Sequence, residues 1–202
     1  MNRIVVFIII SCILLIILFG SNFENIQKYY EQTYKIKGVY IPESIDFAGE
    51  RVPLEYFDVY ESLEREILVA TFFHSQTIQI LKRTQRYFPI IESILKKYNV
   101  PDDFKFLCIA ESNLTQTVSP KQAVGFWQLL ENTAKEYGLE VNDKIDERYN
   151  IKKSTEAACM YFLDAYKQYK SWTLAAASFN FGRKAIDNQI NIQKTRNYYD
   201  MY

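Results

Sequence analysis

A glutamate stands on the apolar stripe of a predicted helix, where a charged side chain is unusual. In the segment PDDFKFLCIAESN, the residues Phe104, Leu107, Cys108 and Glu111 occupy positions i, i+3, i+4 and i+7, which share one face of an α-helix. Burial on such a face raises the pKa of a carboxyl group, and so do the carbonyl dipoles in the last turn of a helix. Glu111 is therefore a candidate general acid that holds its proton near neutral pH. The spacing alone also permits a simpler interpretation, in which Glu111 marks the helix end and reaches water beside Ser112.

Two later segments carry side chains of the kind that grip a sugar. Residues 125–128 (GFWQ) combine a glycine, two aromatic rings and an amide that can both donate and accept hydrogen bonds. Residues 178–180 (SFN) follow three alanines and add a ring and an amide near a predicted helix end. Each segment alone is equally compatible with a packing role, because an aromatic residue or an alanine-rich helix needs no ligand.

The elements that position these residues are predicted to be helices, so the fold class is all-α. Apolar residues recur at helical spacing from about residue 56 onward, and no sustained alternation of apolar and polar residues indicates a strand. Predicted helices cover residues 61–87, 89–98, a segment opened by Pro101, 131–137, 152–169 and 172–179. The helix that begins at Pro101 carries Glu111.

Composition limits the domain count and the chemistry. A chain of 202 residues, 49% of them hydrophobic, can bury one core of ordinary domain size. Its 24 basic and 24 acidic residues leave no positive surplus, so nucleic acid is not an expected partner. His74 is the only histidine, which excludes a zinc site built on a histidine pair. Cys108 and Cys159 lie in apolar helical patterns and are expected to be buried thiols, and neither a metal nor a cofactor is expected.

The N-terminus predicts export from the cytoplasm. Residues 4–19 (IVVFIIISCILLIILF) are uncharged and follow Arg3, the order found in signal peptides and membrane anchors. Because small residues are missing where a signal peptidase would cut, we expect an uncleaved anchor. A cleaved signal peptide and a lipoprotein signal acylated at Cys12 remain the alternatives. In each case the remaining chain is expected in the cell envelope, on the periplasmic side.

The expected organisation has four parts. Residues 1–21 form the signal peptide or anchor, and residues 22–55, with scattered glycines and prolines, form a spacer. Residues 56–100 provide N-terminal helices that pack on a catalytic domain of residues 101–202. The chain contains no internal repeat.

Taken in order and at their separations, the three segments resemble the transglycosylase domain of lytic murein transglycosylases, which are related to goose-type lysozyme. Glu111-Ser112 matches the first motif of that family, residues 125–128 the second, and residues 178–180 the third. The text from VSPKQAVGFWQ to STEAACMYF resembles the branch of membrane-bound lytic transglycosylase D along its length. The resemblance covers roughly residues 101–187.

The resemblance implies a lysozyme-like helical fold with a groove for the glycan strands of peptidoglycan. It implies that Glu111 protonates the bond between N-acetylmuramic acid and N-acetylglucosamine and then accepts the proton of the 6-hydroxyl, which closes a 1,6-anhydro ring. The substrate's own acetamido group would replace the second carboxylate of most glycosidases. The residues then expected to bind substrate are Ser112, Gly125, Phe126, Gln128, Phe179 and Asn180. The acidic residues expected to serve as caps and structural ion pairs are Asp102, Asp103, Asp143, Asp146 and Glu147.

Two departures from the family pattern bear on activity. Phe179 stands where the third motif normally has a tyrosine, so one hydroxyl is missing. The sequence also stops at Tyr202, where members of the branch generally continue with a further helix, so the domain is expected to be short at its C-terminus. A hydrolytic muramidase of the same fold and a non-catalytic murein-binding protein therefore remain alternatives to the transglycosylase. The membrane, through the N-terminal segment, is the other expected partner.

Overall fold

The computed structural model describes residues 38–201, and the predicted anchor at residues 4–19 lies outside this range. All described helices and strands belong to one compact unit that begins at Ile41. The helices are α2 (Phe57–Phe72), α3 (His74–Tyr98), α4 (Lys105–Ser112), α5 (Glu131–Glu136), α6 (Ile151–Tyr169), α7 (Trp172–Phe181) and α8 (Arg183–Gln193). Three 3-10 turns, η1 (Asp102–Phe104), η2 (Glu147–Tyr149) and η3 (Tyr198–Asp200), and the strands β1 (Asp46–Phe47) and β2 (Glu50–Arg51) complete the set. The mostly helical class is confirmed.

None of the helices between residues 38 and 201 is long and apolar enough to cross a membrane.

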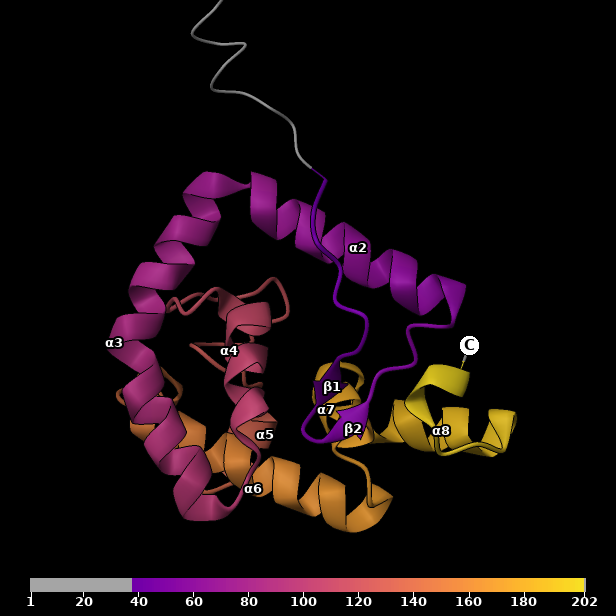
Figure 1. The fold of residues 1–202 in the computed structure, drawn as a ribbon. Helices are drawn as coiled ribbons and strands as arrows, with labels where there is room; N and C mark the ends of the chain where they lie inside the picture. The colour runs from indigo at the N-terminus through magenta and orange to yellow at the C-terminus, as the bar shows by residue number, and fades with distance from the viewer. Residues whose placement is uncertain (1–37, 202) are drawn as a thin grey trace, which may run out of the picture. The chain divides into compact units, whose positions relative to one another are not determined.

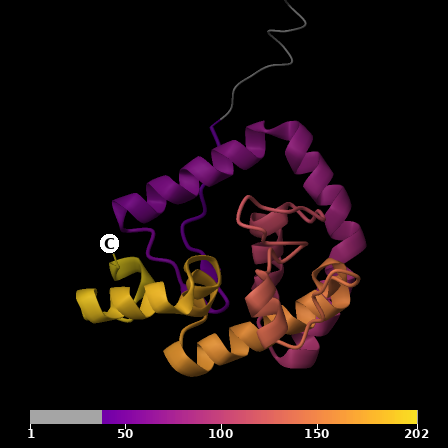
Figure 2. The same ribbon diagram turned by 180° about the vertical axis from the view of Figure 1, so that it is seen from behind.

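The short helix α4 lies inside a frame made by longer helices. Helix α3 packs against both α4 and α6, and α6 packs against α7, which in turn contacts α8. Figures 1 and 2 show, from opposite sides, α4 in the space bounded by α3 and α6. The helix that carries Glu111 is therefore supported by α3 from an earlier part of the chain and, through the hydrogen bond from Ser112 to the Phe126 carbonyl, by the loop that follows it.

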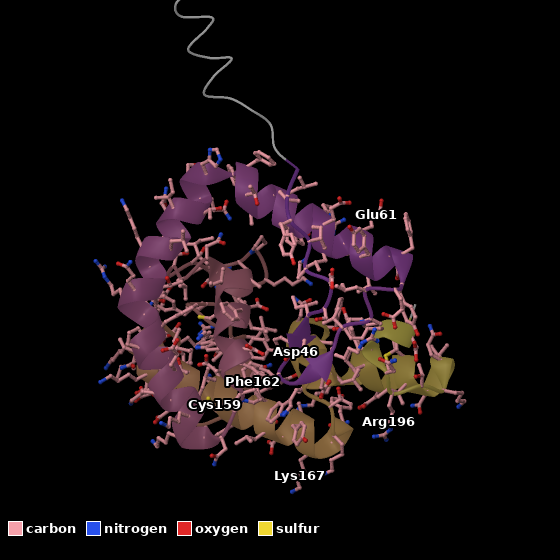
Figure 3. All side chains as sticks on the ribbon, in the orientation of Figure 1. Asp46, Glu61, Cys159, Phe162, Lys167 and Arg196 are labelled. Carbon is pink, nitrogen blue, oxygen red and sulfur yellow. The ribbon has the colours of Figure 1, made fainter. Side chains whose placement is uncertain are left out.

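The core is built around one face of α6. Figure 3 shows Cys159 and Phe162 on the inner side of α6, whereas Lys167 from the same helix points outward. The Phe162 ring lies 4.5 Å from the ring of Phe104, and Trp127 is completely buried beside it at 5.8 Å. Cys108 and Cys159 are free, buried thiols, as expected. Burial raises the pKa of the Cys159 thiol to about 12, so this group stays protonated.

Helices in the C-terminal half begin and end near the predicted residues. The side chain of Asn150 accepts hydrogen bonds from two backbone N–H groups at the start of α6, and the side chain of Ser171 accepts one from the Leu174 N–H at the start of α7. Gly138, with φ +82°, follows the end of α5. Helix α8 was not predicted, although it begins directly after Gly182.

The prediction of one helix over residues 61–87 was wrong. The chain turns at Phe73, where ψ is 59°, and this turn separates α2 from α3. Helix α3 then runs through Pro89, which had been expected to begin a separate helix. Pro89 removes one backbone hydrogen bond, but both Pro89 and Gln85, whose carbonyl loses its donor, are exposed. Water can therefore satisfy the Gln85 carbonyl, and the helix continues.

The last part of the expected spacer forms a hairpin that holds the later helices in place. Strands β1 and β2 pair antiparallel, and the backbone N–H of Ala48 donates to a carboxylate oxygen of Asp103 at 2.7 Å. Glu50 accepts hydrogen bonds from the Ser171 hydroxyl at 2.8 Å and from the backbone N–H groups of Trp172 and Thr173. Its negative charge thus lies at the N-terminus of α7, where the helix dipole favours an anion.

Glu50 makes this contact as a carboxylate. Burial raises the pKa of Glu50, but the hydrogen bonds from Thr173, Trp172 and Ser171 outweigh burial and hold the pKa below its usual value. Because folding lowers the pKa, the stabilisation is fully present above the unfolded-state value of about 4.3. It is lost as the pH falls through the lower value of the folded protein.

We predict that Glu50→Ala lowers the free energy of unfolding by about 1–2 kcal/mol at pH 7, since the first turn of α7 loses its acceptor. Denaturant unfolding monitored by circular dichroism measures this change, and the difference from the parent protein should shrink below about pH 4. Glu55→Ala is the matched control, because Glu55 is exposed and its ion pair with Arg51 lies on the surface. Equal effects of the two substitutions would contradict a special role for Glu50.

Candidate active site

Glu111 lies in the last turn of α4, two residues before a left-handed residue that ends the helix. Asn113 has φ 52°, and its backbone carbonyl accepts a hydrogen bond from Arg83 of α3 at 3.1 Å. The Asn113 side chain also accepts a hydrogen bond from Gln76 at 3.2 Å. Helix α3 therefore fixes the end of α4, and with it the position from which the Glu111 side chain extends.

The Glu111 carboxyl lines a cleft of about 730 Å³. Side chains from the loop between α4 and α5, from α5, from α6 and from the junction of α7 and α8 line the same cleft. They include Gln128, Leu130, Thr133, Glu136, Tyr161, Phe179, Asn180, Phe181 and Arg183. The arrangement leaves one half-buried acid facing a space large enough for a ligand of several rings.

Two opposing effects set the protonation of Glu111. Burial raises the pKa of its carboxyl group, and a hydrogen bond from the Asn180 side chain lowers it by a smaller amount. The net shift is upward, so the protonated acid persists closer to neutral pH than on an exposed glutamate. The Asn180 amide nevertheless gives the carboxylate form a partner once a proton has been transferred. The group is therefore suited to give up a proton and then to take one back.

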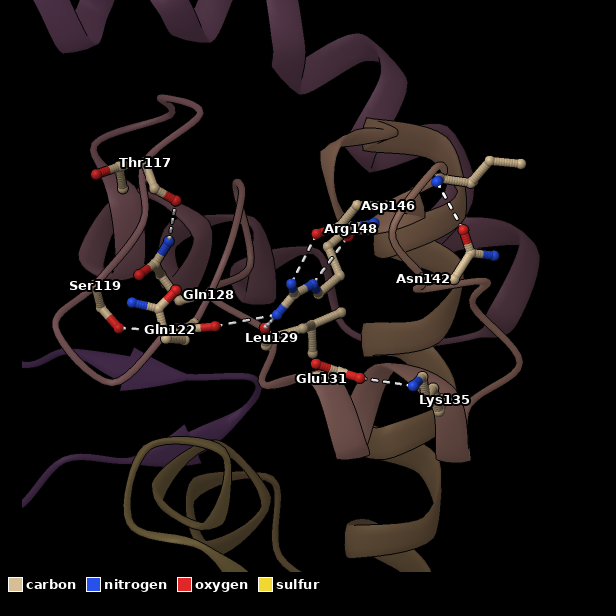
Figure 4. A network of polar contacts seen from close by, with 12 residues as sticks. Thr117, Ser119, Gln122, Gln128, Leu129, Glu131, Lys135, Asn142, Asp146 and Arg148 are labelled. Carbon is tan, nitrogen blue, oxygen red and sulfur yellow. Dashed lines mark hydrogen bonds and ion pairs between the residues drawn. The ribbon is translucent and has the colours of Figure 1, made fainter.

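The loop that carries Gln128 is held by a buried arginine. Figure 4 shows the Arg148 guanidinium donating to both carboxylate oxygens of Asp146, at 2.9 and 2.7 Å, and to the backbone carbonyls of Gln122 and Leu129. Gln128 has φ 47°, and its side-chain amide donates to the Thr117 carbonyl at 3.0 Å and to the Gly125 carbonyl at 2.8 Å. Gln128 thus faces the cleft in a conformation that the loop itself fixes.

Three of the residues predicted from the motifs are buried and do not line the cleft. The Ser112 hydroxyl lies 2.9 Å from the backbone carbonyl of Phe126, to which it donates, and 3.1 Å from that of Cys108. The Phe126 ring packs edge-on against Tyr87 at 4.7 Å. Gly125 has φ +81°, and a Cβ atom there would lie 2.4 Å from the carbonyl oxygen of Arg148. The structure places Ser112, Gly125 and Phe126 beneath the cleft, where they join α4 to the loop.

The third motif reaches the cleft from the end of α7. Phe179 is half-buried, with its ring 5.2 Å from that of Tyr161 and 4.9 Å from that of Phe162. Asn180 is exposed and bonds Glu111. Gln128, Phe179 and Asn180 are therefore the predicted residues that the structure brings together with Glu111.

Sequence reasoning missed Tyr161, Arg183 and Glu136, which also line the cleft. The Arg183 guanidinium stacks on the Tyr161 ring at 4.5 Å and donates to the Tyr137 hydroxyl. The Tyr161 hydroxyl donates to the Ser178 carbonyl at 2.6 Å, so it is already engaged within the protein. Spacing gave no signal for these residues, because Tyr161 occurs in an ordinary apolar helical pattern and Arg183 and Glu136 resemble surface charges.

Most of the remaining acidic residues act as expected, as caps and ion pairs. Asp102 pairs with Lys105, Asp146 with Arg148, and Glu147 with Lys153. Within residues 38–201, no three His, Cys, Asp or Glu side chains are grouped in a way that could hold a metal ion.

Comparison with known proteins identifies a family whose model covers all three motif segments. Residues 88–202 match the family model described as the transglycosylase SLT domain. The chain is 27% identical over 140 residues to a protein of Escherichia coli named membrane-bound lytic murein transglycosylase D, a match that covers 68% of this chain and 30% of the relative. It is 29% identical over 112 residues to a putative tributyltin chloride resistance protein of an Alteromonas species, which covers 52% of this chain and 54% of that relative. The chain thus spans only part of the length of the curated relatives it matches.

We predict that Gly125→Ala lowers the free energy of unfolding by about 3 kcal/mol or more, since the added methyl group would collide with the Arg148 carbonyl in addition to straining the backbone. Gly138→Ala is the matched control, because Gly138 has φ +82° but open space around it, so only the backbone strain of about 1 kcal/mol applies. Thermal unfolding of the two variants separates the contributions. Similar losses would show that the close approach of Arg148 is unimportant.

Proposed function

The chain belongs to the transglycosylase SLT domain family, and from this membership and the cleft we propose that it is a peptidoglycan lytic transglycosylase. The observation that carries the proposal is the position of Glu111. It is a half-buried carboxyl group with a raised pKa, it lines the cleft, and it accepts a hydrogen bond from the asparagine of the third motif. A lysozyme-like fold for the helical domain is part of the proposal.

The proposed reaction uses Glu111 first as an acid and then as a base. The protonated carboxyl group donates its proton to the oxygen that joins C1 of N-acetylmuramic acid to C4 of N-acetylglucosamine, and the β-1,4 bond breaks. The resulting carboxylate, held by the Asn180 amide, accepts the proton of the 6-hydroxyl of the same muramic acid residue. That oxygen attacks C1 and closes a 1,6-anhydro ring. Glu111 ends protonated, ready for the next strand.

The other motif residues divide into two roles in this proposal. Gln128, Phe179 and Asn180 contact the sugar or Glu111, because they line the cleft. Ser112, Gly125 and Phe126 are positioning residues beneath the cleft, since they are buried and bind one another or the backbone. Arg183 and Tyr161 add a cationic and an aromatic group to the cleft wall.

The proposed place of action is the periplasmic side of the cell envelope. The apolar segment at residues 4–19 would anchor the chain in the membrane or direct its export, and the part of the predicted spacer before Ile41 would separate this segment from the domain. Glycan strands are the proposed substrate, and the role is remodelling or turnover of the cell wall.

A hydrolytic muramidase is the second candidate, because one observation favours it. Glu136 is the other carboxylate among the described residues that line the cleft, and it is exposed. A second carboxylate that activates water is what an inverting hydrolase requires. The two functions differ in their products, since hydrolysis adds one water that the anhydro ring lacks.

We predict that the parent protein releases 1,6-anhydro products from purified peptidoglycan and that Glu111→Gln releases none, because the amide matches the acid in size but transfers no proton. Mass spectrometry of the soluble products gives the measurement. The same substitution should leave the melting temperature unchanged or raised, since a buried carboxyl with a raised pKa opposes folding at neutral pH.

Hydrated products from the parent protein, lost on Glu136→Gln, would favour the muramidase. Unchanged anhydro product from Glu111→Gln would refute the assignment of the acid, and a large fall in its melting temperature would assign Glu111 a structural role.

We predict that Phe179→Tyr raises the turnover of peptidoglycan about threefold to tenfold with little change in KM. A hydroxyl placed in the cleft beside Glu111 would add one hydrogen bond of about 0.5–1.5 kcal/mol to the chemical step. Steady-state kinetics with soluble glycan strands gives the measurement. Phe162→Tyr is the control, because its ring neighbours Phe179 but is fully buried away from the cleft. A faster Phe162→Tyr variant, or an unchanged Phe179→Tyr variant, would show that the missing hydroxyl is not the limitation.

A further inference from the structure

A second cavity, of about 500 Å³, lies next to the Glu111 cleft and is also lined by Phe181, the last residue of α7. Its walls come from the first turns of α2, from α8 and from η3. Tyr56 at the start of α2 donates a hydrogen bond to Asp200 of η3 at 3.3 Å, so two of the walls are tied together. No residue of the three motifs lines this cavity.

Phe181 borders both cavities. It is the last residue of α7, it follows Asn180 directly, and it is 64% exposed. Gly182, with φ +83°, then turns the chain into α8. Phe181 lines the cleft of Glu111 on one side and the second cavity on the other. The two cavities are therefore neighbours that share one exposed aromatic ring.

The chemistry of the second cavity suits a neutral sugar. A pyranose ring presents an apolar face of C–H groups and a rim of hydroxyls, so it is recognised by aromatic rings together with a few polar side chains. The rings of Phe181 and Tyr198 supply the first kind of group, and Asp58, Ser62 and Gln189 supply the second. Ala185, a small residue, lines the same cavity.

The charge of the cavity argues against the peptide stems of peptidoglycan as its occupant. Those peptides carry carboxylates, and the residues that line the second cavity include the acid Asp58 but no lysine or arginine. The cleft of Glu111, in contrast, contains Lys121 and Arg183. An anionic ligand would therefore favour the cleft, whereas an uncharged N-acetylated sugar is compatible with the second cavity.

We propose that the second cavity is a saccharide-binding subsite and that Phe181 is the platform on which the glycan strand passes from the catalytic cleft into it. The inference rests on the proposed function, because the strand in the cleft is what reaches the second cavity. Its consequence is that affinity increases with strand length beyond what the cleft alone accommodates. Phe181 acts on substrate binding and leaves the proton transfer at Glu111 unaffected.

The test uses the full chain with Glu111→Gln, which prevents cleavage, and N-acetylglucosamine oligomers from the dimer to the hexamer as probes. Isothermal titration calorimetry should show affinity that rises with length. Adding Phe181→Ala should weaken hexamer binding about threefold to tenfold and dimer binding by a smaller factor, because Phe181 borders both cavities. Ala185→Trp, which fills the second cavity and alters no residue that lines the cleft, should weaken hexamer binding and leave dimer binding unchanged. Phe181→Trp should restore hexamer binding, because it keeps an aromatic platform.

Phe72→Ala is the matched control, since Phe72 is an exposed ring on α2, 48% accessible, that lines neither cavity. Hexamer binding that Phe181→Ala and Ala185→Trp leave unchanged would overturn the subsite, and so would equal losses for the dimer and hexamer. Failure of every oligomer to bind would also overturn it. In each of these cases, the anhydro products of the parent protein on whole peptidoglycan decide separately whether the proposed function stands.

Discussion

The cleft depends on the guanidinium group of Arg148, which is buried beneath the loop between α4 and α5. One face of the loop is fixed by its bonds to the Gln122 and Leu129 carbonyls, and Asp146 neutralises the charge that would otherwise be costly to bury. The Arg148 carbonyl occupies the space left by Gly125. Arg148 thus fixes the conformation of the loop through both its side chain and its backbone carbonyl. The loop in turn fixes the orientation of the Gln128 side chain. Removing the guanidinium would take one donor away from the Gln122 and Leu129 carbonyls and from each carboxylate oxygen of Asp146.

Glu111 shows how packing and chemistry are combined in one helix. Helix α4 has only eight residues, too few to be stable alone, and its end is held by Arg83 and Gln76 from α3. The apolar surroundings that stabilise the helix are the same surroundings that raise the pKa of its carboxyl group. Asn180, from a helix much later in the chain, supplies the opposing hydrogen bond. The acid is therefore tuned by contacts that only the complete fold provides.

The sequence was sufficient to predict helices whose ends carry capping residues. It was insufficient where tertiary contacts determine the end of a helix or the direction of a side chain. Asn150 and Ser171 are good N-terminal caps, and α6 and α7 begin beside them. No glycine or proline near Phe73 indicates a turn in the sequence, so α2 and α3 were predicted as one helix. Motif spacing located Glu111 and Asn180, but it could not distinguish Gln128, which faces the cleft, from Ser112, which is buried under it. That difference depends on side-chain direction, which α4 sets for Ser112 and the turn at residues 125–128 sets for Gln128.

The carboxylate of Glu50 at the start of α7 has a consequence for how the protein folds. It joins residues more than a hundred positions apart, so the contact closes a long loop, and its hydrogen bonds must offset the entropy cost of that closure. All the residues that line the Glu111 cleft lie after Pro101, and the family match begins only at residue 88, yet α7 is capped from outside both segments. A protein cut down to residues 88–202 would contain every residue that lines the cleft. It would lack the Glu50 carboxylate that accepts hydrogen bonds at the start of α7. The hairpin at residues 46–51 is therefore best regarded as part of the domain, because it completes the start of the helix that carries Asn180.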